Sequence, residues 1–278
     1  MRGSDFNLKK NKKKIILILI INILFIIVIY LSLINSIQNG TIETNASLQN
    51  NKKICWGIKR ETDHKQPDLG SYNRKILEDN NGIAIGNKEK KYIYLTFDEG
   101  YEAGYTEKIL ETLKQNQVPA TFFLTAHYVN TQEDLVRQMI DEGHIVGNHT
   151  VNHKSMPDLS EEDIRKEVMD LHQVIFEKYN YEMKYIRPPK GEFSERTLQE
   201  TNKLGYKTVM WSFAYEDWNE NKQPDEEKSK KKILDNLHNG EIMLLHGNSK
   251  TNTNILDSVI KEAKNMGYEF KSLDFFEK

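Results

Sequence analysis

The stretch that decides the fold is Tyr92-Ile93-Tyr94-Leu95-Thr96-Phe97-Asp98-Glu99-Gly100, an apolar segment that ends in two adjacent carboxylates and a glycine. Its apolar part is rich in aromatic and β-branched residues, which predicts a strand. Further along, His149-Thr150-Val151-Asn152-His153 places two imidazoles at positions i and i+4, close enough to share one metal ion. Carboxylates together with paired histidines suit a metal ion that activates water for attack on a carbonyl group. The two segments therefore predict a hydrolase.

Strand-like and helix-like segments alternate through the rest of the chain. The predicted strands are 92–97, 120–125, 144–148, 185–186, 207–212, 241–246 and 268–273, and the predicted helices are 105–116, 134–142, 160–179, 194–204, 229–238 and 251–265. This alternation predicts βαβ units, with a parallel sheet covered by helices. Such a sheet can close into a barrel or stay open and doubly wound.

The positions of the polar residues favour the barrel. Each residue with possible chemistry follows a predicted strand: Asp98, His149, Arg187, Asp217 and His246. A barrel gathers the carboxyl ends of all its strands around one site, whereas an open sheet uses only the strands beside its switch point. We therefore expect an α/β fold with a (β/α) barrel.

The N-terminus predicts a transmembrane anchor. Five lysines within residues 1–14 precede an apolar run over residues 15–34 that only Asn22, Tyr30 and Ser32 interrupt. A helix needs about 20 apolar residues to cross a bilayer, and the lysines should stay cytoplasmic. A cleaved signal peptide usually has a shorter apolar core and a small-residue cleavage site. A buried core helix is disfavoured because the run is apolar on all sides.

We accordingly divide the chain into a basic cytoplasmic tail (1–14), a transmembrane anchor (15–35), a linker (36–53), an N-terminal lead-in (54–90) and a catalytic domain (91–278). Its 39 Lys and Arg residues nearly balance its 41 Asp and Glu residues, so we expect no nucleic-acid partner. We also expect no nucleotide cofactor. Cys55 is the only cysteine, which excludes an intramolecular disulfide.

Asp98 and Glu99 are neighbours on an extended segment, so their side chains should point to opposite sides. The two carboxylates should therefore have different roles, for example Asp98 as general base and Glu99 as metal ligand. Alternatively, both residues belong to a solvated acidic turn with no catalytic role. His149 and His153 are either metal ligands or two surface histidines that share this spacing by chance.

Three further positions have a chemical and a structural interpretation. His246 ends an apolar strand and suits acid–base work, or it is a hydrogen-bonded strand-end histidine. Arg187 begins the rigid turn 187–191 and can orient a carboxylate, or it belongs to a surface turn. Asp217 and Trp218 pair an acid with an apolar wall suited to a sugar ring, although a core tryptophan is the alternative.

The motifs TFDEG (96–100), HTVNH (149–153), RPPKG (187–191), EDW (216–218) and LLH (244–246) occur in this order. The series resembles the five motifs of polysaccharide deacetylases of the nodulation-protein type, carbohydrate esterase family four, over residues 91–273. The lead-in with Trp56-Gly57, His64 and Pro67, and the extended TFDEGYEAGYT and HGN segments, resemble the spore-former subgroup. That subgroup deacetylates N-acetylmuramic acid on the way to the muramic δ-lactam of spore cortex. The resemblance implies a distorted (β/α) barrel.

The resemblance also implies a role for each matching residue. Asp98 would be the general base, held in place by Arg187, and His149 and His153 would bind the metal. His246 would be the general acid that protonates the leaving amine.

Asp217 would support the general acid, and Trp218 and Leu244 would line the acetyl pocket. We expect Tyr101 and Pro189 to contact the substrate as well.

Two positions depart from the family pattern. Glu99 stands where the family usually has an aspartate as third metal ligand, and Ala214 stands where the fourth motif usually begins with an aspartate. The expected cofactor is one divalent metal ion, with zinc as the first choice and cobalt or manganese as alternatives.

The expected function is metal-dependent removal of the acetyl group from N-acetylmuramic acid in peptidoglycan glycan strands, outside the cytoplasm. One alternative is a peptidoglycan N-acetylglucosamine deacetylase that gives lysozyme resistance. The other is a non-catalytic protein that binds wall glycan, with its metal site weakened by Glu99.

Overall fold

The computed structural model describes residue 20 and residues 23–36 and 51–278. Residues 23–36 form a helix, and no helix in these ranges is both long and apolar enough to cross a membrane. Residues 15–19 and 21–22 of the predicted anchor lie outside the described residues, so the anchor stays a prediction. Residues 51–278 form one compact unit.

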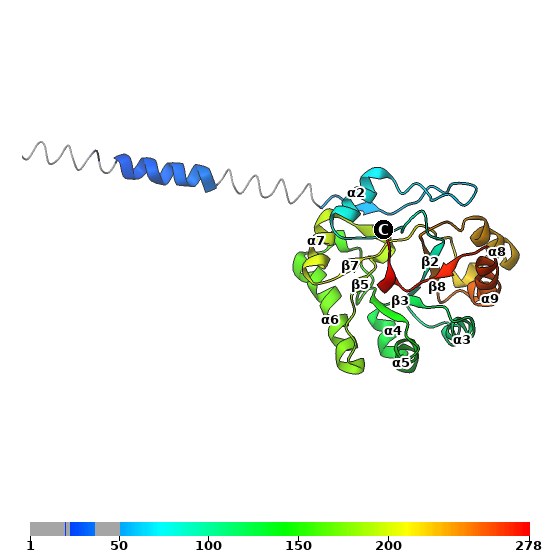
Figure 1. Cartoon of the computed structure of the whole chain (residues 1–278). Helices are drawn as coiled ribbons and strands as arrows, with labels where there is room; N and C mark the ends of the chain where they lie inside the picture. Colours follow the sequence, from blue (N-terminus) through cyan, green and yellow to red (C-terminus); the bar gives the residue numbers. More distant parts are fainter. Residues whose placement is uncertain (1–19, 21–22, 37–50) are drawn as a thin grey trace, which may run out of the picture. The chain divides into compact units, whose positions relative to one another are not determined.

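That unit is built on a curved parallel sheet with helices on its outside (Figure 1). The strand order is β7-β5-β4-β3-β2-β8, and β9 pairs with β2. Every pairing between these strands is parallel, as the alternating sequence predicts. The strands are β2 (Tyr92–Glu99), β3 (Ala120–Leu124), β4 (Ile145–Asn148), β5 (Tyr185–Ile186), β7 (Lys207–Thr208), β8 (Glu241–His246) and β9 (Glu269–Phe270).

The helices follow the strands in the predicted alternation. They are α3 (Thr106–Asn116), α4 (Ala126–Thr131), α5 (Glu133–Asp141), α6 (Glu161–Tyr179), α7 (Glu195–Lys203), α8 (Glu226–Asp235) and α9 (Lys250–Asn265). Serine hydroxyls cap two of them: Ser160 accepts the Asp163 N–H at the start of α6, and Ser194 accepts the Thr197 N–H at the start of α7. These hydroxyls satisfy helix N–H groups that have no partner within the helix.

The barrel is incomplete between β7 and β8. The predicted strand 207–212 pairs with β5 only over Lys207–Thr208, and the chain then reaches β8 through a single bridge between Phe213 and Met243. Beyond Thr208, the carbonyls of Val209 and Met210 accept hydrogen bonds from the Arg187 side chain, and Ile83 of the lead-in bridges Val209. The fold is therefore a curled, partly open parallel barrel.

Alternation along the strands separates two buried faces. In β2, Ile93, Leu95 and Phe97 pack in the cluster beneath the helices, whereas Tyr94 packs with Phe123 inside the barrel. Successive side chains of a strand point to opposite faces, so Asp98 shares the inner face with Tyr94. The alternation of side chains between the two faces therefore determines which polar residues of β2 can contact others inside the barrel.

The lead-in packs on the same unit. Its strand β1 (Ile54–Cys55) pairs antiparallel with β6 (Glu192–Phe193), directly after the turn at 187–191, and its helix is α2 (Ser71–Asp79). The lead-in and residues 193–210 share a hydrophobic cluster, whose buried members are Ile54, Trp56, Leu69, Leu77, Ala84, Ile85, Phe193, Leu198 and Met210. The lead-in thereby supports the strand that follows the RPPKG turn.

Candidate active site

A cavity of about 890 Å³ opens at the carboxyl ends of the strands, where side chains of the inner face meet. Its lining includes Asp98, His149, His153, Leu244 and His246, which come from β2, β8 and the loop after β4. The parallel register places Asp98 of β2 directly beside His246 of β8. Of the five residues predicted to gather at the strand ends, three line the cavity: Asp98, His149 and His246.

A buried ion pair holds Asp98. Arg187 Nη1 donates to Asp98 Oδ1 at 2.8 Å, and the guanidinium also donates from Nε to the Val209 carbonyl and from Nη2 to the Met210 carbonyl. Arg187 is fully buried, with its guanidinium 4.2 Å from the centre of the Phe123 ring. Burial is the largest single effect and would raise the pKa of Asp98, but Arg187, His149 and His246 together outweigh burial and lower it. Asp98 is therefore a buried, ionised carboxylate at the cavity wall.

His149 and His153 face each other across the loop after β4. Their Nε2 atoms are 3.1 Å apart, and Asp98 Oδ2 lies 3.6 Å from His149 Nε2. His149 Nδ1 lies 2.8 Å from the Arg187 carbonyl, which assigns the ring proton to Nδ1 and leaves a lone pair on Nε2. Burial lowers the pKa of His149, and burial together with His149 lowers the pKa of His153 to about 4. Two neutral imidazoles with facing nitrogens fit one divalent cation.

Glu99 does not join this pair, which corrects the predicted three-ligand set. Its neighbour Asp98 occupies the inner face of β2, so Glu99 points to the outer face, where Thr106 Oγ1 approaches its carboxylate at 3.5 Å. The carboxylate packs directly against Gly247, where an added Cβ would come within 1.8 Å of Glu99 Oε1. Burial raises the pKa of Glu99 well above its ordinary value, and the charges of Glu102 and Asp98 raise it further. Across the residues that the structure describes, no three His, Cys, Asp or Glu side chains converge as a metal site.

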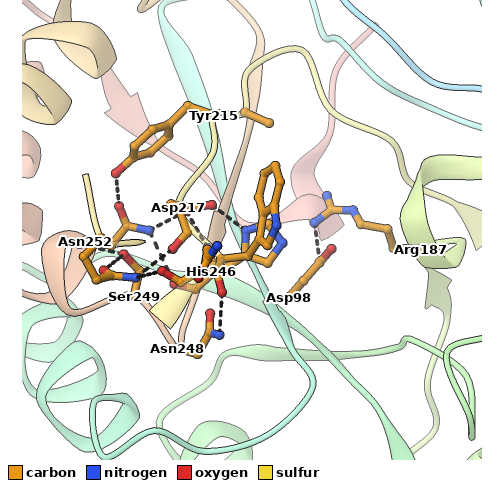
Figure 2. Close-up of polar contacts among 12 residues, drawn as sticks. Asp98, Arg187, Tyr215, Asp217, His246, Asn248, Ser249 and Asn252 are labelled. Atoms are coloured by element: carbon orange, nitrogen blue, oxygen red, sulfur yellow. Dashed lines mark hydrogen bonds and ion pairs between the residues drawn. The ribbon is translucent and has the colours of Figure 1, made fainter. Parts of the chain in front are cut away.

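A second buried pair joins His246 to Asp217. His246 Nδ1 donates to Asp217 Oδ1 at 2.7 Å, so Nε2 is the nitrogen available to the cavity. Asp217 follows the irregular segment after β7 rather than a strand, and it reaches His246 from that loop (Figure 2). Burial opposes the charged imidazole, but the charge and hydrogen bond of Asp217 outweigh it and raise the pKa of His246. His246 is thus suited to carry and donate a proton near neutral pH.

The residues predicted to contact the substrate lie in different places around the cavity. Trp218, Leu244 and Tyr101 line the cavity, and the half-exposed Trp218 ring lies 5.6 Å from the His246 ring, centre to centre. Pro189 is buried and does not line the cavity; the next residue, Lys190, does so from a left-handed conformation with φ of 59°. The turn therefore presents Lys190 rather than Pro189 to the cavity.

Sequence reasoning missed several residues that line the cavity: His127, Asn152, Lys190, Trp211 and Asn248. Asn248 lies in the HGN segment and donates to the Tyr101 hydroxyl at 3.0 Å, next to a smaller cavity of about 470 Å³. Trp211 lies in the segment predicted as a regular strand. Its place at the cavity follows from the departure of the chain from β5, which no local pattern signals.

Comparisons with known proteins found similar sequences and structures. A family model described as polysaccharide deacetylase matches residues 85–209. The peptidoglycan-N-acetylmuramic acid deacetylase PdaA of Bacillus subtilis is 41% identical over 231 residues, which are 82% of this chain and 88% of that protein. The solved structure of PdaA, a family 4 carbohydrate esterase, matches with a TM-score of 0.79 and 40% identity over 81% of this chain and 97% of that chain.

Two other relatives show the range of similar proteins. A peptidoglycan-N-acetylglucosamine deacetylase of Bacillus cereus is 34% identical and covers 71% of this chain and 93% of that protein. A solved pseudoenzyme of the same esterase family, from Bacillus anthracis, is 28% identical with a TM-score of 0.65, over 70% of this chain and 68% of that chain.

A partly open parallel barrel with a buried carboxylate, paired histidines and an Asp–His pair at one end defines a hydrolase of the (β/α)-barrel class. The chain belongs to the polysaccharide deacetylase family, carbohydrate esterase family 4.

Proposed function

We propose that this chain is a metal-dependent peptidoglycan N-deacetylase that removes the acetyl group from N-acetylmuramic acid, a step towards the muramic δ-lactam of spore cortex. The observation that carries the proposal is one cavity holding both Asp98 with its arginine partner and His246 with its carboxylate partner. The choice of muramic acid over glucosamine rests on the relatives, because the muramic deacetylase is 41% identical and the glucosamine deacetylase 34%.

The proposed chemistry assigns opposite proton transfers to the two pairs. Asp98, ionised beside Arg187, accepts a proton from water while the water oxygen bonds to the acetyl carbonyl carbon. The C–N bond then breaks, its electron pair stays on nitrogen, and His246 Nε2 gives that nitrogen a proton. Acetic acid and a free amine leave, and the acid loses its proton to water to give acetate. The proton held by Asp98 returns through solvent to His246 Nε2, and His246 keeps its other proton on Nδ1 throughout.

A divalent cation bound by His149 and His153 would polarise the carbonyl and acidify the water. The donor set fits zinc first, with cobalt or manganese as alternatives, and Asp98 Oδ2 is the carboxylate oxygen nearest to the pair. Trp218 and Leu244 offer apolar surface to the sugar and its acetyl methyl group.

Zinc binding tests the proposed ligands separately from activity. We expect His153→Gln to weaken zinc affinity by at least about 100-fold in calorimetry, and Glu99→Gln to bind zinc as the unaltered chain does. Equal losses of zinc affinity in His153→Gln and Glu99→Gln would show that Glu99 is a zinc ligand.

The activity test uses the full chain in mild detergent with zinc, and Asp98→Asn as control. Glycan strands whose muramic acid lacks the peptide stem are incubated with each, and the products are mapped by mass spectrometry. Acetyl loss on muramic acid, absent with Asp98→Asn, supports the proposal. Loss on glucosamine favours the lysozyme-resistance alternative. Glycan binding without acetyl loss under zinc, cobalt or manganese would identify a wall-binding protein.

We further infer that residues 15–35 anchor the chain in the cell membrane, with the catalytic domain outside the cytoplasm. Support comes from the length of the apolar run and the preceding lysines. In a host membrane preparation, alkaline carbonate should leave an anchored chain in the pellet, and N-terminal sequencing should find residues 1–14 intact. A mature N-terminus after residue 35 would show a cleaved signal instead.

A further inference from the structure

Behind Asp217, a row of buried polar side chains leads away from the cavity (Figure 2). The Asp217 carboxylate is fully buried and accepts three hydrogen bonds. His246 Nδ1 donates to Oδ1 at 2.7 Å, while the His246 backbone N–H and Asn252 Nδ2 donate to Oδ2 at 3.0 and 2.6 Å. Within residues 51–278, no lysine or arginine pairs with this carboxylate. The Asn252 amide is therefore the one side chain besides His246 that stabilises the buried charge.

The orientation of the Asn252 amide is fixed from its far side. The Tyr215 hydroxyl donates to Asn252 Oδ1, so the amide NH₂ group must face Asp217. Burial raises the pKa of Tyr215, which keeps its hydroxyl protonated as a donor. A flipped amide would set its oxygen against Asp217 Oδ2 and leave two acceptors in contact. Asn252 itself lies in the first turn of α9, where Ser249 Oγ accepts its backbone N–H at 3.2 Å.

We propose that Asn252 and Tyr215 are positioning residues for His246: they hold the Asp217 carboxylate so that it fixes the imidazole with Nε2 towards the cavity. This inference rests on the proposed role of His246 as general acid. Without the Asn252 amide, Oδ2 keeps a single backbone donor, and the buried carboxylate is free to rotate towards other partners. The imidazole then loses its fixed orientation, although Asp98, Arg187 and the histidine pair keep every contact described above.

A spectroscopic test needs no substrate. In the full chain labelled with ¹⁵N-histidine, the His246 Nδ1 proton should give a far-downfield resonance, assigned by its loss in His246→Gln. We expect Asn252→Leu to broaden this resonance beyond detection or move it upfield. The matched control is Thr253→Val, which removes a buried hydroxyl from the same helical turn. An unchanged resonance in Asn252→Leu would overturn the inference.

A kinetic test separates acid catalysis from general damage. Release of an amine needs a proton, whereas release of 4-nitrophenolate from 4-nitrophenyl acetate does not. We expect Asn252→Leu to lower kcat on the glycan amide by about 10- to 100-fold, which is part of the roughly 10²- to 10⁴-fold that general acid catalysis typically contributes. The KM for glycan and the rate of ester hydrolysis should stay within about twofold of the unaltered chain. Tyr215→Phe should lower the amide kcat by about 3- to 10-fold, since Asn252 keeps its place in α9.

Equal loss of ester and amide hydrolysis in Asn252→Leu would mean a structural role and refute the inference. Amide hydrolysis at the rate of Thr253→Val would refute it as well. If the unaltered chain releases no acetate from glycan, the proposed function fails by itself, and the histidine resonance still decides the role of Asn252.

Discussion

Arg187→Met should expose how strongly the fold depends on the buried ion pair with Asp98. The methionine keeps much of the aliphatic stem but removes the guanidinium, which lies against the Phe123 and Trp211 rings and donates to Asp98 Oδ1 and two backbone carbonyls. Breaking a buried pair by deleting one partner costs about 3–5 kcal/mol, because the other charge is left without a partner. We expect the free energy of unfolding of Arg187→Met to fall by about that amount at pH 7.

The pH dependence identifies the cause. In the unaltered chain the lowered pKa of Asp98 adds stability that is present above the unfolded value of about 4 and is lost as the pH falls through the folded pKa. In Arg187→Met, burial without the guanidinium raises the pKa of Asp98, so its charged form penalises the folded state at neutral pH. The difference between the two chains should therefore be largest near pH 7 and shrink towards pH 4.

The assay is urea unfolding of the metal-free full chain in mild detergent, followed by tryptophan fluorescence at several pH values. Arg196→Met is the matched control, because Arg196 donates to the carbonyls of Pro157 and Leu159 and has no carboxylate partner within residues 51–278. The loss in free energy of unfolding caused by Arg196→Met should not change with pH. Asp98→Asn combined with Arg187→Met should cost less than the sum of the single changes. A pH-independent gap, or strict additivity, would refute the reasoning.

Three more predictions concern the cavity. Gly247→Ala should lower stability by about 1–3 kcal/mol because its Cβ would overlap the Glu99 carboxylate, and Glu99→Ala in the same chain should recover most of the loss in urea unfolding. Asp217→Asn should move the high-pH limb of the kcat profile to lower pH. Asp217 raises the pKa of His246 and so keeps the imidazole protonated to higher pH, and removing the Asp217 charge lowers that pKa. A limb that does not move would exclude His246 as the general acid. Trp218→Ala should raise KM for glycan about 3- to 10-fold with kcat within twofold, since its half-exposed ring offers surface rather than protons; a fall in kcat alone would contradict this.

Much of the fold and of the site could be predicted because the signals are local. The residues of β2 alternate between two buried faces, the strands and helices follow one another as expected, and Asp98, His149, Arg187 and His246 lie at or just beyond strand ends. Parallel strands bring their carboxyl ends to the same edge, so position along the chain was enough to gather these four residues.

Other features depend on contacts between distant segments. The strand predicted over residues 207–212 is cut short at Thr208, and beyond it Arg187 and Ile83, both distant in sequence, contact Val209 and Met210. Asn252 lies in an ordinary helix turn, and only folding brings its amide to Asp217. Asparagine in a helix has no pattern that distinguishes a surface position from a positioning role.

The sequence by itself determined that an acidic pair ends the first strand of a parallel α/β fold and that two histidines lie one helical period apart. Only the tertiary structure decided that Asp98 meets Arg187 and His149 on the inner face, whereas Glu99 is buried beneath the helices against Gly247. The physical reason is that strand geometry sends neighbouring side chains to opposite faces, and the packing of the whole barrel sets which face becomes the cavity.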